Sequence, residues 1–117
     1  MLIDYGKGEE ECALGVTAMM VYEQQFRSDI IQDLFGLAAI RRSPEDEDIV
    51  FAVDYRTTNW TAVVKALWAG LKAADDGCPG YREWSAGLGA IDLNRLAEEI
   101  IPEAYGKFFR AGAGDSG

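Results

Sequence analysis

The chain has 117 residues, of which 49% are hydrophobic and 11% aromatic, which is enough apolar material for one globular domain and argues against wholesale disorder. Eleven Lys and Arg against twenty Asp and Glu give a net charge of −9, which repels phosphates and disfavours binding to nucleic acid. No apolar run approaches the roughly 20 residues that span a bilayer, and the start of the chain lacks signal-peptide features. We therefore expect a cytosolic protein in which Cys12 and Cys78 are reduced thiols.

The first third of the chain predicts a turn and two helices. Residues 1–14 start apolar and turn at Gly6-Lys7-Gly8, a pattern that allows a short hairpin. Apolar residues then follow helical spacing from Val16 to Phe26. A second helix is expected from a cap at Ser28 to Arg41-Arg42, where positive charge suits a helix C-terminus. The apolar faces of these two helices hold Ala18, Met19, Val21, Tyr22, Phe26, Ile30, Ile31, Leu34, Phe35, Leu37 and Ala38.

The next segment opens on the most specific helix start in the sequence. Ser43 suits a cap, Pro44 suits the first helical position, and the following carboxylates face the positive end of the helix dipole. The apolar run from Ile49 to Val53 would continue that helix, so we predict a helix here. Its β-branched residues leave a buried strand as the alternative.

A long central helix is expected after a cap at Thr57 or Thr58. Small residues on several of its faces let neighbouring backbones approach, which predicts a helix covered on more than one side. It ends near Asp75, and the breaker up to Gly80 leads to a short helix from Tyr81 to Leu88. The stripe is Trp60, Val63, Val64, Leu67, Trp68 and Leu71, and the small residues are Ala62, Ala66, Ala69, Gly70 and Ala73.

The last helix is expected to open at Asp92. Pro102 lies inside its stripe and predicts a kink or break near residues 98–101. Residues 111–117 have nothing to bury and should form a flexible tail, which leaves residues 1–110 as a single helical domain. The fold prediction is mainly α, a compact bundle of about five helices. The last stripe is Leu93, Leu96, Ala97, Ile100, Ile101, Ala104, Tyr105 and Phe108.

The residues that usually carry catalysis are scarce in this sequence. It has no histidine, the commonest general base and metal ligand. The acidic runs at residues 45–48 and 75–77 lack the spacing of a calcium loop, and Gly6-Lys7-Gly8 lacks that of a phosphate-binding loop. Cys78 has no base or cationic cluster beside it in the sequence to lower its pKa. We therefore predict no catalytic, cofactor-binding or metal-binding residues, and no enzymatic activity.

The end of the last helix is the candidate surface for a protein partner. Phe109 falls off the apolar stripe, beside Phe108 and just before the tail. Two adjacent Phe residues at a helix end form either a plug in the core or a hydrophobic patch for a partner. Trp60, Trp68 and Trp84, by contrast, are expected in the core. The candidate partner-binding residues are Ile101, Tyr105, Phe108 and Phe109.

Three segments carry a family resemblance through their order and spacing. They are Tyr22 to Ile31 (YEQQFRSDII), Leu67 to Lys72 (LWAGLK) and Pro79 to Trp84 (PGYREW), within a span of about residues 14 to 108. In this succession the chain resembles the tail assembly chaperones of long-tailed (siphovirus-like) bacteriophages and prophages. Arg27 stands where glycine would be expected, so the junction between the first two helices should differ.

The resemblance implies a small, mostly helical, non-enzymatic protein. It would bind the tape measure protein and keep it soluble until the tail tube polymerises around it. The tail tube protein is a further candidate partner, as is a second copy of the chain. The location implied is the cytoplasm of the bacterial host, and the mature virion would lack the protein.

Two other classes of function stay open. One is a small acidic phage-encoded inhibitor or regulator that occupies the nucleic-acid site of a host protein. A single continuous surface of carboxylates would favour it, whereas dispersed charge beside an apolar groove favours the chaperone. The other is a small-ligand-binding helical enzyme, which requires an enclosed pocket with convergent polar groups.

Overall fold

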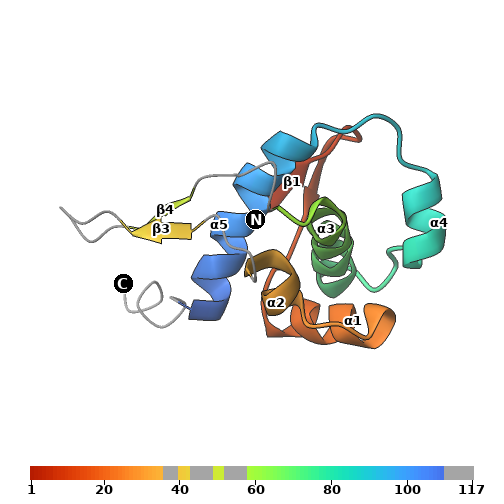
Figure 1. Ribbon diagram of the computed structural model, residues 1–117. Coiled ribbons are helices and arrows are strands. Elements are labelled where there is room, and N and C mark those ends of the chain that lie inside the picture. The colour runs from red at the N-terminus through yellow and green to blue at the C-terminus, as the bar shows by residue number, and fades with distance from the viewer. Residues whose placement is uncertain (36–39, 43–48, 52–57, 110–117) are drawn as a thin grey trace.

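Helices dominate the part of the chain that the computed structural model describes, which is residues 1–35, 40–42, 49–51 and 58–109 (Figure 1). This confirms a mainly α fold that includes a short N-terminal hairpin. The predicted tail, residues 111–117, lies outside the described residues. In chain order the elements are β1 (Leu2–Asp4), β2 (Glu9–Glu11), α1 (Val16–Phe26), α2 (Ile30–Phe35), β3 (Ile40–Arg42), β4 (Ile49–Phe51), α3 (Trp60–Ala74), α4 (Tyr81–Ala86) and α5 (Leu93–Phe109).

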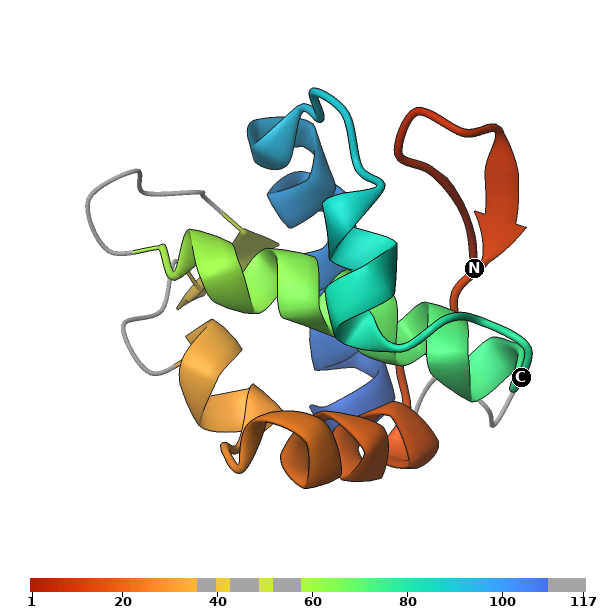
Figure 2. The same ribbon diagram turned by 90° about the vertical axis from the view of Figure 1, so that its right-hand side faces the viewer.

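Helix α3 lies at the centre of the molecule. It contacts α1, α2, α4, α5 and strand β2, so it is covered on several sides, as its small residues predicted (Figures 1 and 2). Its N-terminus is capped by Asn59 rather than Thr58: the Asn59 Oδ1 accepts a hydrogen bond of 3.1 Å from the amide of Ala62. Thr57 lies outside the described residues. Buried positions of α3 are Ala62, Val63, Ala66, Leu67, Trp68, Ala69, Gly70 and Leu71.

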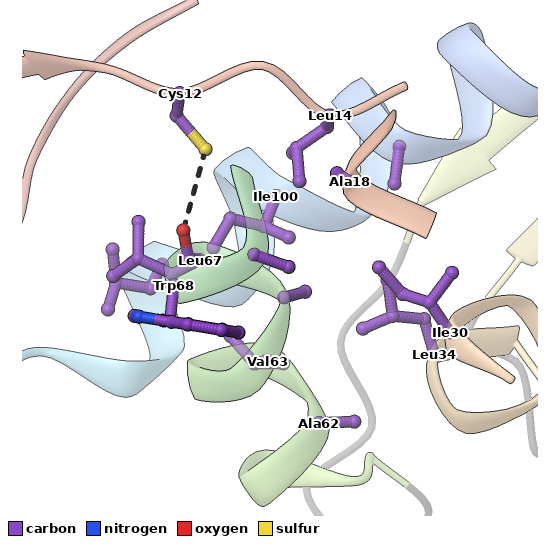
Figure 3. Close-up of a cluster of buried hydrophobic side chains, with 14 of the residues drawn as sticks. Cys12, Leu14, Ala18, Ile30, Leu34, Ala62, Val63, Leu67, Trp68 and Ile100 are labelled. Carbon is purple, nitrogen blue, oxygen red and sulfur yellow. Dashed lines mark hydrogen bonds between the residues drawn. The ribbon is translucent and has the colours of Figure 1, made fainter. Parts of the chain in front are cut away.

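The core forms where α3 meets α1, α2, α5 and the segment after the hairpin (Figure 3). Cys12 and Leu14 reach it from that segment, and the Cys12 Sγ lies 3.9 Å from the carbonyl oxygen of Leu67. The backbone amide of Ala13 donates a 2.9 Å hydrogen bond to the carbonyl of Gly70. The N-terminal segment is therefore fixed directly onto the central helix. None of the described helices combines the length and the apolar character that crossing a bilayer would need.

The N-terminal hairpin is held by its turn and by side chains. β1 pairs with β2 in antiparallel register, with Ile3 opposite Glu10. Gly6 and Gly8 have φ angles of +115° and +88°, a region that only glycine enters without strain. The hydroxyl of Tyr5, just after β1, donates a 2.8 Å hydrogen bond to the carboxylate of Glu10 in β2. The hairpin is thus packed rather than free.

The structure corrects the prediction for residues 28–53. α2 ends at Phe35, not at Arg41-Arg42, and the helix predicted to follow Ser43 is wrong in its described part, because residues 49–51 form β4. β4 pairs antiparallel with β3, Ile49 opposite Arg42. β-branched residues favour extended backbone, and pairing with a second strand satisfies backbone groups that a helix would have used. Residues 36–39 and 43–48, including Leu37 and Ala38, lie outside the described residues.

The start of α2 also differs from expectation. Asp29, not Ser28, caps it: the Asp29 Oδ1 accepts a 2.8 Å hydrogen bond from the amide of Ile31. The Ser28 hydroxyl instead donates to the carboxylate of Asp33 at 2.7 Å. A carboxylate accepts an amide hydrogen bond at a positive helix end more strongly than a hydroxyl does, which explains the choice.

Helices α4 and α5 lie close to their predicted positions. α4 ends at Ala86, two residues before the predicted Leu88. Asp92 opens α5 as expected, since its carboxylate accepts a 3.1 Å hydrogen bond from the amide of Arg95. α5 runs without interruption through Pro102, so the chain does not break there. Buried residues on both sides of the proline, Ile100 and Ala104 among them, secure the helix in the core despite one lost hydrogen bond.

Candidate partner-binding surface

The four residues predicted to bind a partner differ in how much they present to solvent. Ile101 is buried, with 4% of its surface exposed, and Phe108 is partly buried against the core. Tyr105 is half-buried, and Phe109 is 53% exposed. The two adjacent Phe residues therefore have different environments. The Phe108 ring packs against the core, and the Phe109 ring faces outward at the end of α5.

Phe109 belongs to a small group of rings that we call the C-terminal aromatic cluster: Phe35, Tyr105 and Phe109. The Tyr105 and Phe109 ring centroids lie 5.0 Å apart, one turn from each other on α5. Phe35, the last residue of α2, lies 5.8 Å from Phe109 and 6.1 Å from Tyr105, with its ring edge-on to both. These separations are typical of favourable aromatic pairs.

Phe35 is the member that the sequence did not single out. The sequence placed it within a helix running to Arg42, on the same buried face as Ile31 and Leu34. In the structure α2 ends at Phe35 itself, and the ring extends to α5 instead. The contact of Phe35 with α5 depends on how α2 and α5 pack together. The periodicity of apolar residues within one helix could not predict it.

A second group of rings lies in the core or packs against it and serves packing. The Phe26 ring lies 5.7 Å from Trp68 and 4.8 Å from Tyr81, and Trp68 lies 5.7 Å from Tyr81. Trp84 and Tyr22 extend the group at 6.2 Å from Tyr81 and 4.9 Å from Phe26. Trp68 and Trp84 are 3% and 6% exposed, which confirms their placement in the core. We call Tyr22, Phe26, Trp68, Tyr81 and Trp84 the internal aromatic cluster.

Polar atoms at the edge of the internal cluster bind neighbouring elements. The Tyr22 hydroxyl and the Ser28 hydroxyl each donate a 2.7 Å hydrogen bond to the same oxygen of Asp33, which joins α1 to α2. Burial, reinforced by the Asp33 hydrogen bond and charge, raises the pKa of Tyr22. The Trp68 indole donates to the carbonyl of Pro79 at 2.9 Å, ahead of α4. These groups hold helices in place.

A cleft of about 520 Å³ lies between the hairpin and α4. The Cys78 thiol is in its wall, but burial raises the pKa of that thiol despite Lys72 nearby, so the thiol stays protonated at neutral pH. The carboxylate of Glu10 in the wall accepts the Tyr5 hydroxyl. Among the described residues, no three Cys, Asp or Glu side chains gather closely enough to hold a metal ion. The cleft is lined by Tyr5, Lys7, Glu10, Glu11, Leu71, Asp75, Gly77, Cys78, Pro79, Glu83, Trp84 and Gly87.

Acidic residues are spread over several sides of the described part of the molecule. The hairpin, the outer face of α1, the turn after α3, α4 and α5 each contribute at least one exposed carboxylate (Figures 1 and 2). Such a distribution gives general repulsion between copies of the chain rather than one acidic face. Exposed acidic residues are Asp4, Glu9, Glu11, Glu23, Asp29, Asp75, Asp76, Glu83, Asp92 and Glu98.

Comparison with known proteins assigns no family to this chain. No family model matches it, and neither the curated proteins nor the solved structures contain a match. The resemblance to tail assembly chaperones therefore stays a prediction.

Proposed function

We propose that the chain is a non-enzymatic tail assembly chaperone of a long-tailed bacteriophage or prophage, which binds the tape measure protein and keeps it soluble during tail assembly. The observation that carries the proposal is the C-terminal aromatic cluster, in which Phe109 is 53% exposed on a chain of net charge −9. Exposed aromatic rings bind apolar segments of partners, and a strongly charged surface keeps the resulting complex in solution.

The internal aromatic cluster also supports the proposal. Each of the three segments that resemble the chaperone family contributes rings to it: Phe26 from the first, Trp68 from the second, and Tyr81 with Trp84 from the third. Segments that share a spatial unit are constrained together, so their order and spacing reflect one packing arrangement rather than three independent coincidences. The rings of these segments serve the packing of the fold, while Phe109 lies at the end of α5, outside all three segments.

Among the described residues, the charge distribution fits the inhibitor alternative less well. Imitation of a nucleic acid needs carboxylates concentrated over one continuous face. Here exposed carboxylates occur on the hairpin, on α1 and on α5, which lie on different sides of α3 (Figure 1). The chaperone proposal requires only that the charge surround an apolar contact.

The test is co-expression with the tape measure protein whose gene the proposal places beside the gene of this chain. We expect the tape measure protein to move from the pellet to the soluble fraction, and Phe109→Ser to reduce that effect. Leu2→Ser is the matched control, because Leu2 is 60% exposed on β1, whereas the aromatic cluster is built from α2 and α5. A tape measure protein that stays in the pellet with the unaltered chain would refute the proposal. If Leu2→Ser reduces the amount of soluble tape measure protein as much as Phe109→Ser does, Phe109 is not part of the binding surface.

The proposal also fixes where the protein acts. A chaperone of this kind works in the host cytoplasm and leaves the assembly before the particle is complete. Mass spectrometry of purified virions should therefore find tape measure and tail tube proteins without this chain. Stoichiometric amounts of the chain in virions would make it a structural component instead.

A further inference from the structure

Helix α1 carries apolar side chains on its outer face as well as on its inner face. Val16 and Met20, one turn apart, are 62% and 55% exposed. Ala18 and Tyr22 on the opposite side are fully buried, and α1 packs against α3 there. A helix that is apolar on the side away from its own core presents a surface suited to another molecule.

A groove lies along this outer face, where α1 meets the turn into α2. Its volume is about 310 Å³. Two of its residues are methionines, whose unbranched and polarisable side chains adapt to partners of varied shape. Two others carry carboxylates, and no Lys or Arg lines it. The groove, called the Met groove below, is lined by Met19, Met20, Glu23, Gln24 and Asp29.

We propose that the Met groove docks an amphipathic helix of a partner protein that bears Lys or Arg beside its apolar stripe. The apolar stripe would lie on Met19 and Met20, and the cationic side chains would face Glu23 and Asp29. α1 has 11 residues and is therefore about 16 Å long, which matches roughly three turns of a docked helix.

Charge complementarity selects this occupant over a second copy of the chain. Two copies facing each other through this groove would bring Glu23 and Asp29 of one against those of the other, on chains that each carry a net charge of −9. A cationic helix is attracted by the same groups. Only the identity of the natural partner rests on the proposed function. That partner would be a basic amphipathic segment of the tape measure protein.

The experiment uses the full chain labelled with ¹³C at the methionine methyl groups, because the sequence has only three methionines. The probe is a 14-residue designed helix with Leu at positions i, i+3, i+4 and i+7 and with Lys at its flanks. We expect the signals of Met19 and Met20 to shift on titration, and that of Met1 to stay in place. Met19→Leu and Met20→Leu assign the signals.

Two matched peptides separate the apolar contribution from the ionic one. A peptide with Glu in place of Lys keeps the apolar stripe, and a scrambled Lys peptide keeps the charge without the stripe. Both should bind at least tenfold more weakly than the probe. If the Glu peptide binds as tightly as the probe, charge does not contribute to binding. If the scrambled peptide binds as tightly, binding is a nonspecific attraction between charges. Either result overturns the proposal.

Variants of the chain test the groove itself. Met20→Gln preserves size and charge and should weaken the probe about tenfold, while Leu2→Gln, the same kind of change at another exposed apolar residue, should leave it within twofold. Glu23→Gln combined with Asp29→Asn should weaken binding severalfold and flatten its salt dependence; the Asn side chain can still cap α2. An unshifted Met19 and Met20, or a dimer that Met20→Gln dissociates, would overturn the proposal.

The two proposals fail independently. If the groove binds the basic probe but the tape measure protein stays insoluble, the chaperone function is wrong and the docking site stands. If the tape measure protein is solubilised equally by the unaltered chain and by Met20→Gln, and the probe shifts no methionine, the groove assignment is wrong and the function stands.

Discussion

The thiol of Cys12 lies against the Cα of Gly70 in α3, in the place where a Cβ on residue 70 would project. Cys12 is fully buried, and a methyl group of Leu14 lies only 3.1 Å from the same point. The amide of Ala13 between them donates to the Gly70 carbonyl at 2.9 Å. The N-terminal segment can approach the central helix this closely only because residue 70 has no side chain.

Gly70→Ala should therefore destabilise the fold. Ala is the better helix former by about 1 kcal/mol, but overpacking costs roughly 1–3 kcal/mol and should win at this buried contact. Gly106→Ala in α5 is the matched control, because its Cβ position has no atom within 4 Å beyond its chain neighbours and the nearby backbone of α5, and it should raise stability by up to about 1 kcal/mol. Urea unfolding of the two variants measures both changes. A gain at both positions would mean that the contact with Cys12 relaxes easily.

Stability should fall as the pH rises above 9. Burial raises the pKa of Cys12 from its ordinary 9.0 to about 12, so the unfolded chain releases this proton at a lower pH than the folded chain does. The contribution of the protonated Cys12 thiol to the free energy of unfolding is fully present below pH 9. It is lost between about pH 9 and 12, at up to about 1.4 kcal/mol per pH unit. Chemical unfolding at pH 8 and 10 measures it. Cys12→Ala should flatten the dependence more than Cys78→Ala, and the reverse order would contradict the assignment.

Arg27→Gly should stabilise the junction between α1 and α2. Arg27 caps α1 with φ of 54° and ψ of 39°, a left-handed conformation that costs a residue with a Cβ roughly 1–2 kcal/mol and glycine almost nothing. Glycine loses about 0.5–1 kcal/mol through the entropy of the unfolded chain, so the net gain should be about 0.5 kcal/mol. Gln25→Gly, at an exposed position in the last turn of α1, should lose stability instead. Thermal unfolding of both variants decides, and a loss at residue 27 would contradict the strain argument.

Substitutions at Phe108 and Phe109 should differ in their effects on the stability of the fold. Phe108 packs against the core, so Phe108→Ser should cost on the order of 2 kcal/mol and lower the thermal midpoint. Phe109 is 53% exposed, so Phe109→Ser should change stability by less than about 1 kcal/mol. Calorimetry of the single variants measures this difference. A large loss with Phe109→Ser would place its ring in the core and remove it as a binding residue.

The sequence predicted α3 and α5 well because each has a long apolar stripe at helical spacing. Asp92 marked the start of α5, and the small residues of α3 indicated a helix covered on several sides. Gly6 and Gly8 indicated a turn, and the hairpin formed around it. In these regions local preference and the final packing agree, so short-range patterns were sufficient.

The region from Ser28 to Val53 shows where short-range patterns fail. The start signal at Ser43 and the apolar run after it fit a helix, yet the described residues 49–51 pair with residues 40–42 as strands. The backbone of a strand forms its hydrogen bonds with another segment of the chain. A local sequence pattern does not indicate which segment will lie close enough to pair. The cap of α2 also differs: Asp29 accepts the hydrogen bond from the amide of Ile31, and the hydroxyl of Ser28 donates to Asp33 instead.

The sequence by itself determined the chemical character of this protein: acidic, without histidine, and helical around two apolar stripes. Only the tertiary structure decided how far neighbouring elements cover the other apolar side chains of these helices. Phe26 and Tyr81 pack beside the buried Trp68 and are partly covered, whereas Phe109 and Met20 remain exposed. The physical reason is that periodicity gives each helix an apolar face, while burial depends on whether another helix covers that face.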